Sequence, residues 1–193
     1  MKLENLTFQG PALSDEPLLA TLPHNLAALL KQINGFIQFH GGFHLYGACT
    51  EPLWHSLREA WTGPNAAHRH YKHIREQDVP FGEDCLGFQF FLRTGKVIFL
   101  DCETGTVEAL DADLSAFFDW VDTDPVNNLG MQPLLKSIQD GNIPQPGQLI
   151  SEQPPFCRPE SSKGVTLTCI ASADRRTALI DLHKSMRELK GGA

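Results

Sequence analysis

The chain has 193 residues, of which 41% are hydrophobic and 20% are charged, and its formal net charge is −7. This length and composition fit a folded domain with its own core and exclude wholesale disorder. A surface of this charge repels polyanions, so nucleic acid is not an expected direct ligand. No apolar run is long enough to span a bilayer, and the first ten residues lack the pattern of a secretory signal. We therefore expect a cytoplasmic protein without a membrane partner.

The cysteines do not form a recognisable framework. They are odd in number, scattered, and never arranged as CxxC, which argues against a set of disulfides and against a structural zinc site. We expect free thiols, and we expect neither a metal nor another cofactor. The cysteines are Cys49, Cys85, Cys102, Cys157 and Cys169.

The first third of the chain predicts helices around an aromatic segment. Residues 1–20 are polar and broken by prolines, which predicts a lead-in with a short helical turn near its end. Pro23 suits the first turn of a helix, and apolar residues then recur at helical spacing until Asn34-Gly35 stops it. The segment 36–46 fits either two short strands joined at Gly41-Gly42 or an irregular loop. Pro52 begins a second helix that Gly63-Pro64 ends.

The clearest β pattern follows in residues 86–92, 97–101 and 106–110. These runs are aromatic, aliphatic or β-branched, and the turn signals Thr94-Gly95 and Glu103-Thr104-Gly105 separate them. Their connections are too short for parallel crossovers, which need a dozen or more residues. The pattern therefore predicts a three-stranded antiparallel meander.

The last third predicts further helices and one more strand. Asp113 is a candidate N-cap for a helix over 113–122, and another helix is expected over 129–138. Five prolines and little periodicity predict an extended linker over 142–164. A strand over 165–170 and a basic amphipathic helix over 174–189 complete the chain.

These elements predict an α+β fold with a mostly antiparallel sheet and helices packed on it. The expected organisation is an N-terminal lead-in (1–20), a core domain (21–140), and a Pro-rich linker with a C-terminal strand and helix packed on the core (141–193).

One stretch of the sequence is acidic without interruption. No Lys or Arg lies between Lys96 and Lys136, so nearby cations in the sequence cannot neutralise it. Such a stretch would attract a basic partner, although an acidic surface kept for solubility is an alternative interpretation. The candidate partner-binding residues are Asp101, Glu103, Glu108, Asp111, Asp113, Asp119, Asp122 and Asp124.

Other residues raise the question of catalysis. His68, His70 and His73 could hold a transition metal, but the adjacent basic residues oppose a cation. A solvated loop and a basic contact for a partner are the alternatives. His40 and His44 could face each other across a hairpin, without a carboxylate or thiol at a telling offset. The acidic pairs Glu83-Asp84 and Asp101/Glu103 invite a catalytic interpretation, yet acidic residues in turns more often cap backbone amides. No nucleophile, phosphate-loop or metalloprotease motif is present.

The order of several short motifs resembles the SMI1/KNR4 (SUKH) superfamily over roughly residues 20–190. Each motif is weak alone, and their order and spacing carry the resemblance. They are Leu22-Pro23, Asn34-Gly35-Phe36, Leu45-Tyr46-Gly47, Val79-Pro80-Phe81-Gly82-Glu83-Asp84, Leu86-Gly87, the turn with Asp101, Glu103, Thr104 and Gly105, and a tail with Leu129-Gly130, Pro133-Leu134 and Pro154-Pro155-Phe156.

The resemblance implies an α+β fold and a non-enzymatic, protein-binding role. In bacteria that role is typically an immunity protein that binds and neutralises a polymorphic toxin, often a nuclease. The alternatives are a regulatory scaffold protein of the same fold and a metal-dependent hydrolase that uses the histidines. The segment rich in histidine before Val79-Pro80 and the polar Ser161-Ser162-Lys163 depart from the family pattern.

Overall fold

The computed structural model describes residues 3–191, with side chains described up to residue 188. Within that range the chain forms one antiparallel sheet of seven strands in the order β1-β2-β3-β4-β5-β6-β7, and a separate two-stranded sheet, β8-β9. The strands are β1 (Leu6–Gln9), β2 (Phe36–Gln38), β3 (Phe43–Leu45), β4 (Val79–Asp84), β5 (Gln89–Arg93), β6 (Lys96–Leu100), β7 (Val107–Ala109), β8 (Gln148–Gln153) and β9 (Thr166–Ala171).

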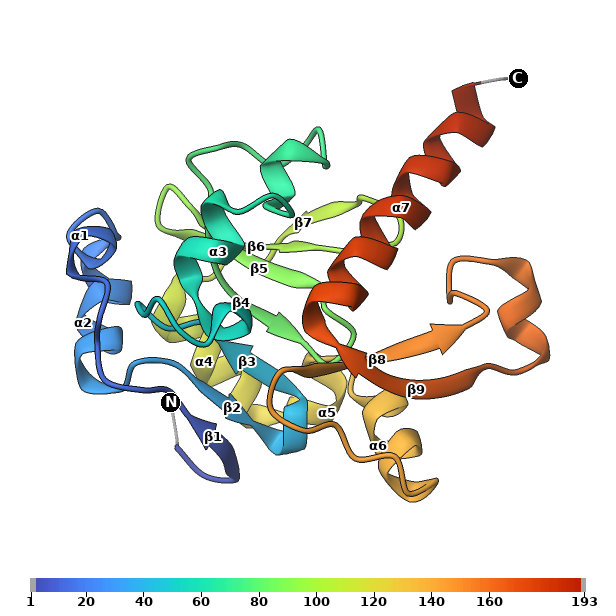
Figure 1. Ribbon diagram of the computed structural model, residues 1–193, viewed down its shortest axis with the longest axis horizontal. Coiled ribbons are helices and arrows are strands. Elements are labelled where there is room, and N and C mark those ends of the chain that lie inside the picture. Colours follow the sequence, from blue (N-terminus) through green and yellow to red (C-terminus); the bar gives the residue numbers. More distant parts are fainter. Residues whose placement is uncertain (1–2, 192–193) are drawn as a thin grey trace.

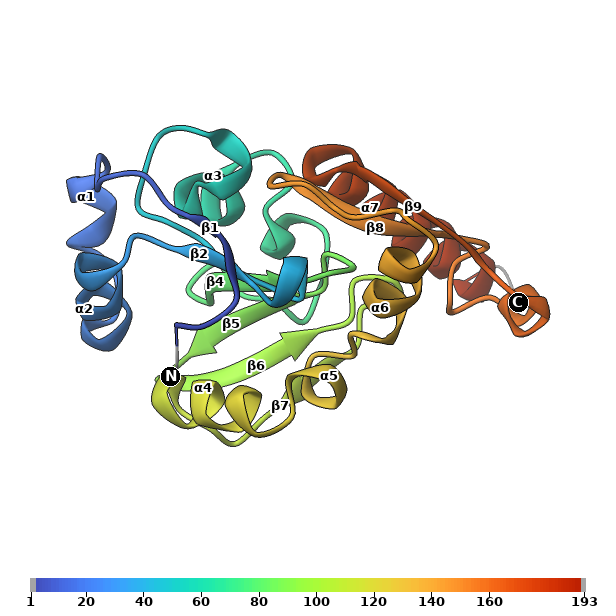
Figure 2. The same ribbon diagram turned by 90° about the horizontal axis from the view of Figure 1, so that it is seen from below.

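The helices form a layer on each face of the large sheet. Helices α3 and α7 cover one face, and α4 and α5 lie on the other (Figures 1 and 2). The expected α+β fold with a mostly antiparallel sheet is therefore confirmed. The helices are α1 (Glu16–Leu19), α2 (His24–Gln32), α3 (Leu57–Thr62), α4 (Leu114–Thr123), α5 (Pro125–Asn128), α6 (Gln132–Gln139) and α7 (Ser172–Gly191), with 3-10 turns η1 (Phe39–Gly41), η2 (Leu53–His55), η3 (Ala67–Arg69) and η4 (Pro159–Lys163).

Alternation along β5 divides the core between the two layers. Phe90 packs against Phe117 of α4, with ring centroids 5.0 Å apart. Its neighbour Phe91 belongs to a second cluster that includes Leu179 and Ile180 of α7. Successive strand residues point to opposite faces, so one strand supplies both cores.

Elements with strong local signals form where the sequence predicts them. Helix α2 ends before Asn34-Gly35, β2 and β3 form the aromatic hairpin, and β5, β6 and β7 form the antiparallel meander. The Asp113 side chain caps α4 by accepting a hydrogen bond from the Ala116 N–H at 2.9 Å. The predicted helix stop, meander and N-cap are confirmed, and of the two alternatives for residues 36–46 the structure contains the hairpin.

Other elements differ from the prediction. Strand β8 occupies part of the segment expected as an extended linker: residues 148–153 contain no proline, and they pair with β9. The helix expected from Pro52 is interrupted at Ser56, whose side chain accepts a hydrogen bond from the Glu59 N–H, so that η2 ends and α3 begins there. Strand β1 was not predicted, and the short helical turn that was expected in the same lead-in is α1.

A β-bulge in β4 decides which of its side chains face α7. Pro80 pairs with Phe91 and Gly82 with Phe90, so Phe81 is the extra residue of the bulge. Phe81 packs on the α4 side, 5.4 Å from the Phe117 ring centroid. Glu83 then lies opposite His44 of β3 and forms a hydrogen bond with it. Without the bulge, period-2 alternation would place Phe81 and Glu83 on the same face.

Two glycines of the family-like motifs make room for one buried ring. A Cβ on Gly35 would lie 2.5 Å from His55 Cε1, and one on Gly47 would lie 2.5 Å from His55 Nε2. Gly35 also has a φ of +77°, a conformation that side chains with a Cβ rarely adopt. The Asn34-Gly35 stop after α2 therefore also forms one wall of the His55 site.

We predict that Gly35→Ala lowers the free energy of unfolding by about 2–5 kcal/mol, because it combines a left-handed backbone with overpacking. Gly95→Ala is the matched control: Gly95 has a φ of +83° and no atom within 4 Å of a built Cβ. Its cost should be about 1–2 kcal/mol. Urea unfolding of both variants measures the difference, and equal losses would contradict the proposed crowding against His55.

Candidate functional site

A buried ion pair connects the central strand of the sheet to the last helix. Arg176 of α7 donates from Nη2 to Glu83 Oε1 at 2.8 Å and from Nε to Oε2 at 3.2 Å. Burial opposes the ionised form of Glu83, but the Arg176 charge and the His44 hydrogen bond outweigh it and lower the Glu83 pKa from 4.5 to about 2. Glu83 is therefore ionised, and Arg176 is its buried counter-charge.

Two histidines extend this pair into a chain of hydrogen bonds. His44 Nδ1 lies 3.0 Å from Glu83 Oε1, and His44 Nε2 lies 2.8 Å from His55 Nδ1. His55 Nε2 lies 2.9 Å from the Asn34 carbonyl oxygen. Both ends of the chain are acceptors, so three contacts need three N–H groups, and two neutral imidazoles supply two. A third proton would complete the chain, but it would also place a second buried positive charge beside Arg176.

Burial favours the neutral form of both imidazole rings over the protonated form. It is the largest influence on both histidines, and it lowers the pKa of His55 from 6.5 to about 4 and that of His44 below its usual value. One contact of the chain therefore brings two acceptors together at neutral pH. Protonation would supply the missing N–H group, but it would add a buried charge that destabilises the fold.

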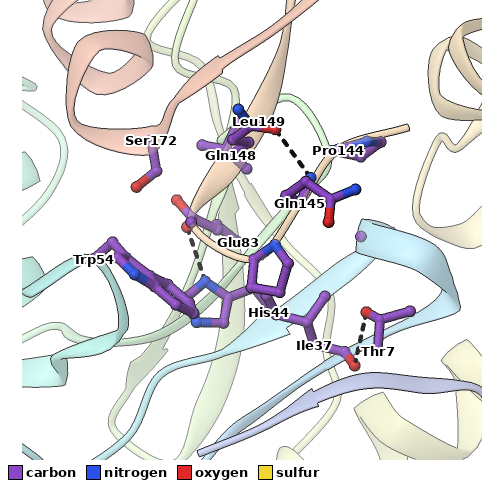
Figure 3. Close-up of a pocket in the computed structure, with 13 residues that line it drawn as sticks. Thr7, Ile37, His44, Trp54, Glu83, Pro144, Gln145, Gln148, Leu149 and Ser172 are labelled. Carbon is purple, nitrogen blue, oxygen red and sulfur yellow. Dashed lines mark hydrogen bonds and ion pairs between the residues drawn. The ribbon is translucent and has the colours of Figure 1, made fainter. Parts of the chain in front are cut away.

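The space beside the network is too small for a substrate. The cavity has a volume of about 10 Å³ and is lined by His44, Glu83, Trp54 and Ser172, among others (Figure 3). The buried Ser172 hydroxyl has no hydrogen-bond partner among the described residues. This volume is at the lower limit for one water molecule, which the hydroxyl and a carboxylate could both bind. The arrangement supports the fold and gives a ligand no access to the His44–Glu83 pair.

A second buried cluster holds the C-terminal hairpin. Arg175 donates from Nη2 to both carboxylate oxygens of Glu152 on β8, at 2.9 and 2.8 Å, and from Nε to the Leu86 carbonyl at 2.9 Å. Glu103 accepts from the backbone N–H groups of Phe156 and Cys157. Burial and the hydrogen bond with Glu103 raise the Glu152 pKa from 4.5 to about 8. The cluster therefore joins β8, the turn after β6 and the segment before η4 through buried polar contacts.

The acidic stretch divides into carboxylates with structural roles and carboxylates on the surface. Glu103 is buried in the cluster above and is removed from the candidate partner surface. Asp101 accepts from the backbone N–H groups of Glu103 and Thr104, and Asp113 and Asp124 cap α4 and α5. Asp113 and Asp124 remain exposed in these roles; Glu108, Asp111 and Asp119 are also exposed, and Asp122 is half-buried.

An apolar groove is lined in part by Glu108, one of these surface carboxylates. Its volume is about 390 Å³, and its lining comes from β4–β7, α4, α5 and the segments that connect them. Trp120 of α4 and Phe99 of β6 contribute aromatic walls, and Glu108 of β7 also lines it. Trp120 is 38% exposed, which is high for so large an apolar side chain. The sequence indicated the acidic residues here, but it gave no sign of the groove.

The histidine-rich segment does not form a metal-binding group in the structure. Within the described residues, no three His, Cys, Asp or Glu side chains are placed to hold a metal ion. His68 lies in η3, His70 Nε2 lies 2.9 Å from the Pro64 carbonyl oxygen, and His73 is exposed. His40 is also exposed, whereas His44 is buried against Glu83, so the two do not face each other.

Within the described part of the chain, no helix has both the length and the apolar character to cross a membrane. No protein-family model and no curated protein matches the chain.

We predict that burial of His55 makes stability pH-dependent. The folded pKa is below the unfolded value of 6.5, so the unfolded state binds the proton first, and the stabilisation present above pH 6.5 is lost as the pH falls towards 4. His55 alone accounts for about 3 kcal/mol at most. Asp84 and Glu152 have raised pKa values, so their contributions to the free energy of unfolding fall as the pH rises. This opposes the effect of His55 over an overlapping range of pH.

The difference between wild type and His55→Gln isolates the histidine. Urea unfolding between pH 4 and pH 7 should give a steeper rise of stability with pH for the wild type than for the variant. Parallel profiles would show that His55 titrates alike in the folded and unfolded states.

We predict that Glu83→Gln costs about 3–5 kcal/mol of stability, because it leaves the Arg176 charge buried without a counter-ion. The double variant Glu83→Gln/Arg176→Gln removes both charges and should lose less than the single variant. Thermal and urea unfolding measure both. A double variant that is less stable than the single one would mean that the pair contributes through shape rather than charge.

Proposed function

We propose that this chain is a non-enzymatic, protein-binding domain of the SMI1/KNR4 (SUKH) type that acts as a bacterial immunity protein in the cytoplasm. In this role it neutralises a toxin, a nuclease being the typical case, by direct binding. The observation that carries the proposal is the apolar groove whose lining includes the exposed Trp120 and the exposed carboxylate Glu108. An apolar centre with a charged rim is the usual anatomy of a protein interface.

The charge of the surface supports a basic partner. Glu108 and Asp111 make no ion pair with any described residue, and the Lys96 ammonium, the nearest sequence neighbour of opposite charge, donates to the Asp111 carbonyl instead. Nucleases are basic where they bind nucleic acid, so an acidic surface matches a toxin of that class. Opposite potentials accelerate association more than they add affinity.

The interior supports binding rather than catalysis. The groups with the chemistry of a general acid or base, His44 and Glu83, are fully engaged with each other, with Arg176 and with His55. The adjacent space of about 10 Å³ admits no substrate. The family-like residues Gly35 and Gly47 pack around the same histidine, which is a scaffolding role.

The direct test is protection against a toxin. The products of genes next to the gene for this chain would be produced in bacteria with and without it, and growth would be measured. Restored growth together with a complex of the two purified proteins supports the proposal. A toxic neighbour that the chain neither restrains nor binds would contradict it for that pair.

We predict that the triple variant Glu108→Lys, Asp111→Lys, Asp119→Lys slows association with the toxin about tenfold or more. Stability should change by less than about 1 kcal/mol, because exposed charges contribute little. Stopped-flow association rates at about 0.05 and 0.5 M salt measure the effect, since the Debye length falls severalfold across that range. The wild-type rate should fall with salt.

The control reverses the same number of exposed acidic charges elsewhere. Glu16, Glu76 and Glu160 lie on α1, on the loop before β4 and on η4, and all three are exposed. The triple variant with lysine at these positions has the same net charge. Equal slowing by both variants would show that overall charge, rather than the groove region, governs association.

A further inference from the structure

A buried carboxylate lies in the wall of the groove and forms no ion pair with any described side chain. Asp84, at the end of β4, is 5% exposed and lines the groove together with Phe88, Phe99, Glu108 and Trp120. Its Oδ1 accepts from the backbone N–H groups of Leu86 and Phe88 at 2.9 and 3.0 Å. No described side chain donates to Oδ2, and no described Lys, Arg or His forms an ion pair with this carboxylate.

The position of Asp84 follows from the bulge in β4. Because Glu83 faces α7, the next residue along the strand faces α4, on the side of the groove. Burial raises the Asp84 pKa from 3.8 to about 7; the Glu83 charge adds to that effect, while the two backbone hydrogen bonds and the Arg175 charge oppose it. The fold therefore holds an acidic group in an apolar surrounding that a cation would stabilise.

The walls suit a cation that is also flat. Phe88 and Phe99 lie edge to face with ring centroids 6.1 Å apart, and Trp120 is the exposed aromatic of the same groove. Aromatic faces attract cations, and a guanidinium both stacks on rings and forms directed hydrogen bonds to a carboxylate. Glu108 adds a second acceptor in the lining.

We propose that this groove is a binding site for one arginine side chain of a protein partner, with Asp84 and Glu108 as its acceptors and Phe88, Phe99 and Trp120 as its aromatic walls. The proposal rests on the proposed protein-binding function and names the chemistry that the surface recognises. The groove volume of about 390 Å³ lies within the usual range of ligand sites.

The test uses a small probe in place of the partner. N-acetyl-arginine methylamide would be titrated into the full chain at pH 8, where Asp84 is ionised, and the Trp120 indole signal followed by NMR. That signal is assigned with Trp120→Phe, since the chain has three tryptophans. N-acetyl-citrulline methylamide is the neutral control of nearly the same shape. We expect the arginine probe to bind about tenfold more tightly than the citrulline probe.

Two variants locate the contact. Asp84→Asn keeps an Oδ1 that can accept from Leu86 and Phe88 but removes the charge, and it should abolish the preference for arginine. Glu108→Gln, on the exposed surface of β7, should reduce it and gives a second measurement if Asp84→Asn does not fold.

Equal binding of the two probes, absence of binding, or unchanged preference in the folded variants would overturn the arginine site. This result is independent of any toxin. If the titration fails, the arginine site is wrong, and the protection experiment still tests the proposed function. If the protection experiment fails, the titration still tests the site.

Discussion

The fold depends on one charge pair in its interior. Glu83 on the central strand β4 and Arg176 on α7 are both buried, and either charge alone would be costly there. Their contact at 2.8 Å therefore fixes where α7 begins relative to the sheet. The preceding residue, Arg175, is thereby directed to Glu152 and to the Leu86 carbonyl, which holds β8 against the body. Two adjacent arginines thus bind β8 and α7 to the large sheet. In this position of α7, Leu179 and Ile180 pack in the second apolar cluster.

The sequence predicted elements whose signals are local and missed contacts that join distant segments. Asp113 as an N-cap, Asn34-Gly35 as a helix stop and Thr94-Gly95 as a meander turn each act within a few residues, and each was recognisable. Strand β4 was noted as a motif without being assigned as a strand. Glu83 is 39 residues from His44 and 93 from Arg176, and it reaches them through a bulge that interrupts the alternation. The one available hint was the Arg175-Arg176 pair, which lies on the sheet-facing side of a helix.

Charge counted along the sequence overstated the acidic surface. The eight carboxylates of the stretch looked equivalent, but the fold uses Asp101, Asp113 and Asp124 to satisfy backbone N–H groups and buries Glu103. The surface field therefore lacks Glu103, and Glu108, one of its exposed members, lines an aromatic groove that no sequence pattern indicated. Motif residues such as Gly35 and Gly47 serve the packing around His55. A resemblance based on these glycines therefore reflects the scaffold and does not identify a partner.

The late position of Arg176 has a consequence for synthesis on the ribosome. Glu83 is synthesised 93 residues before Arg176, the guanidinium that neutralises it. A nascent chain that has completed the meander holds an uncompensated carboxylate in what will be its interior. Its central sheet gains full stability only when α7 arrives. Until the final helix docks, the core of the nascent chain therefore lacks its buried counter-charge.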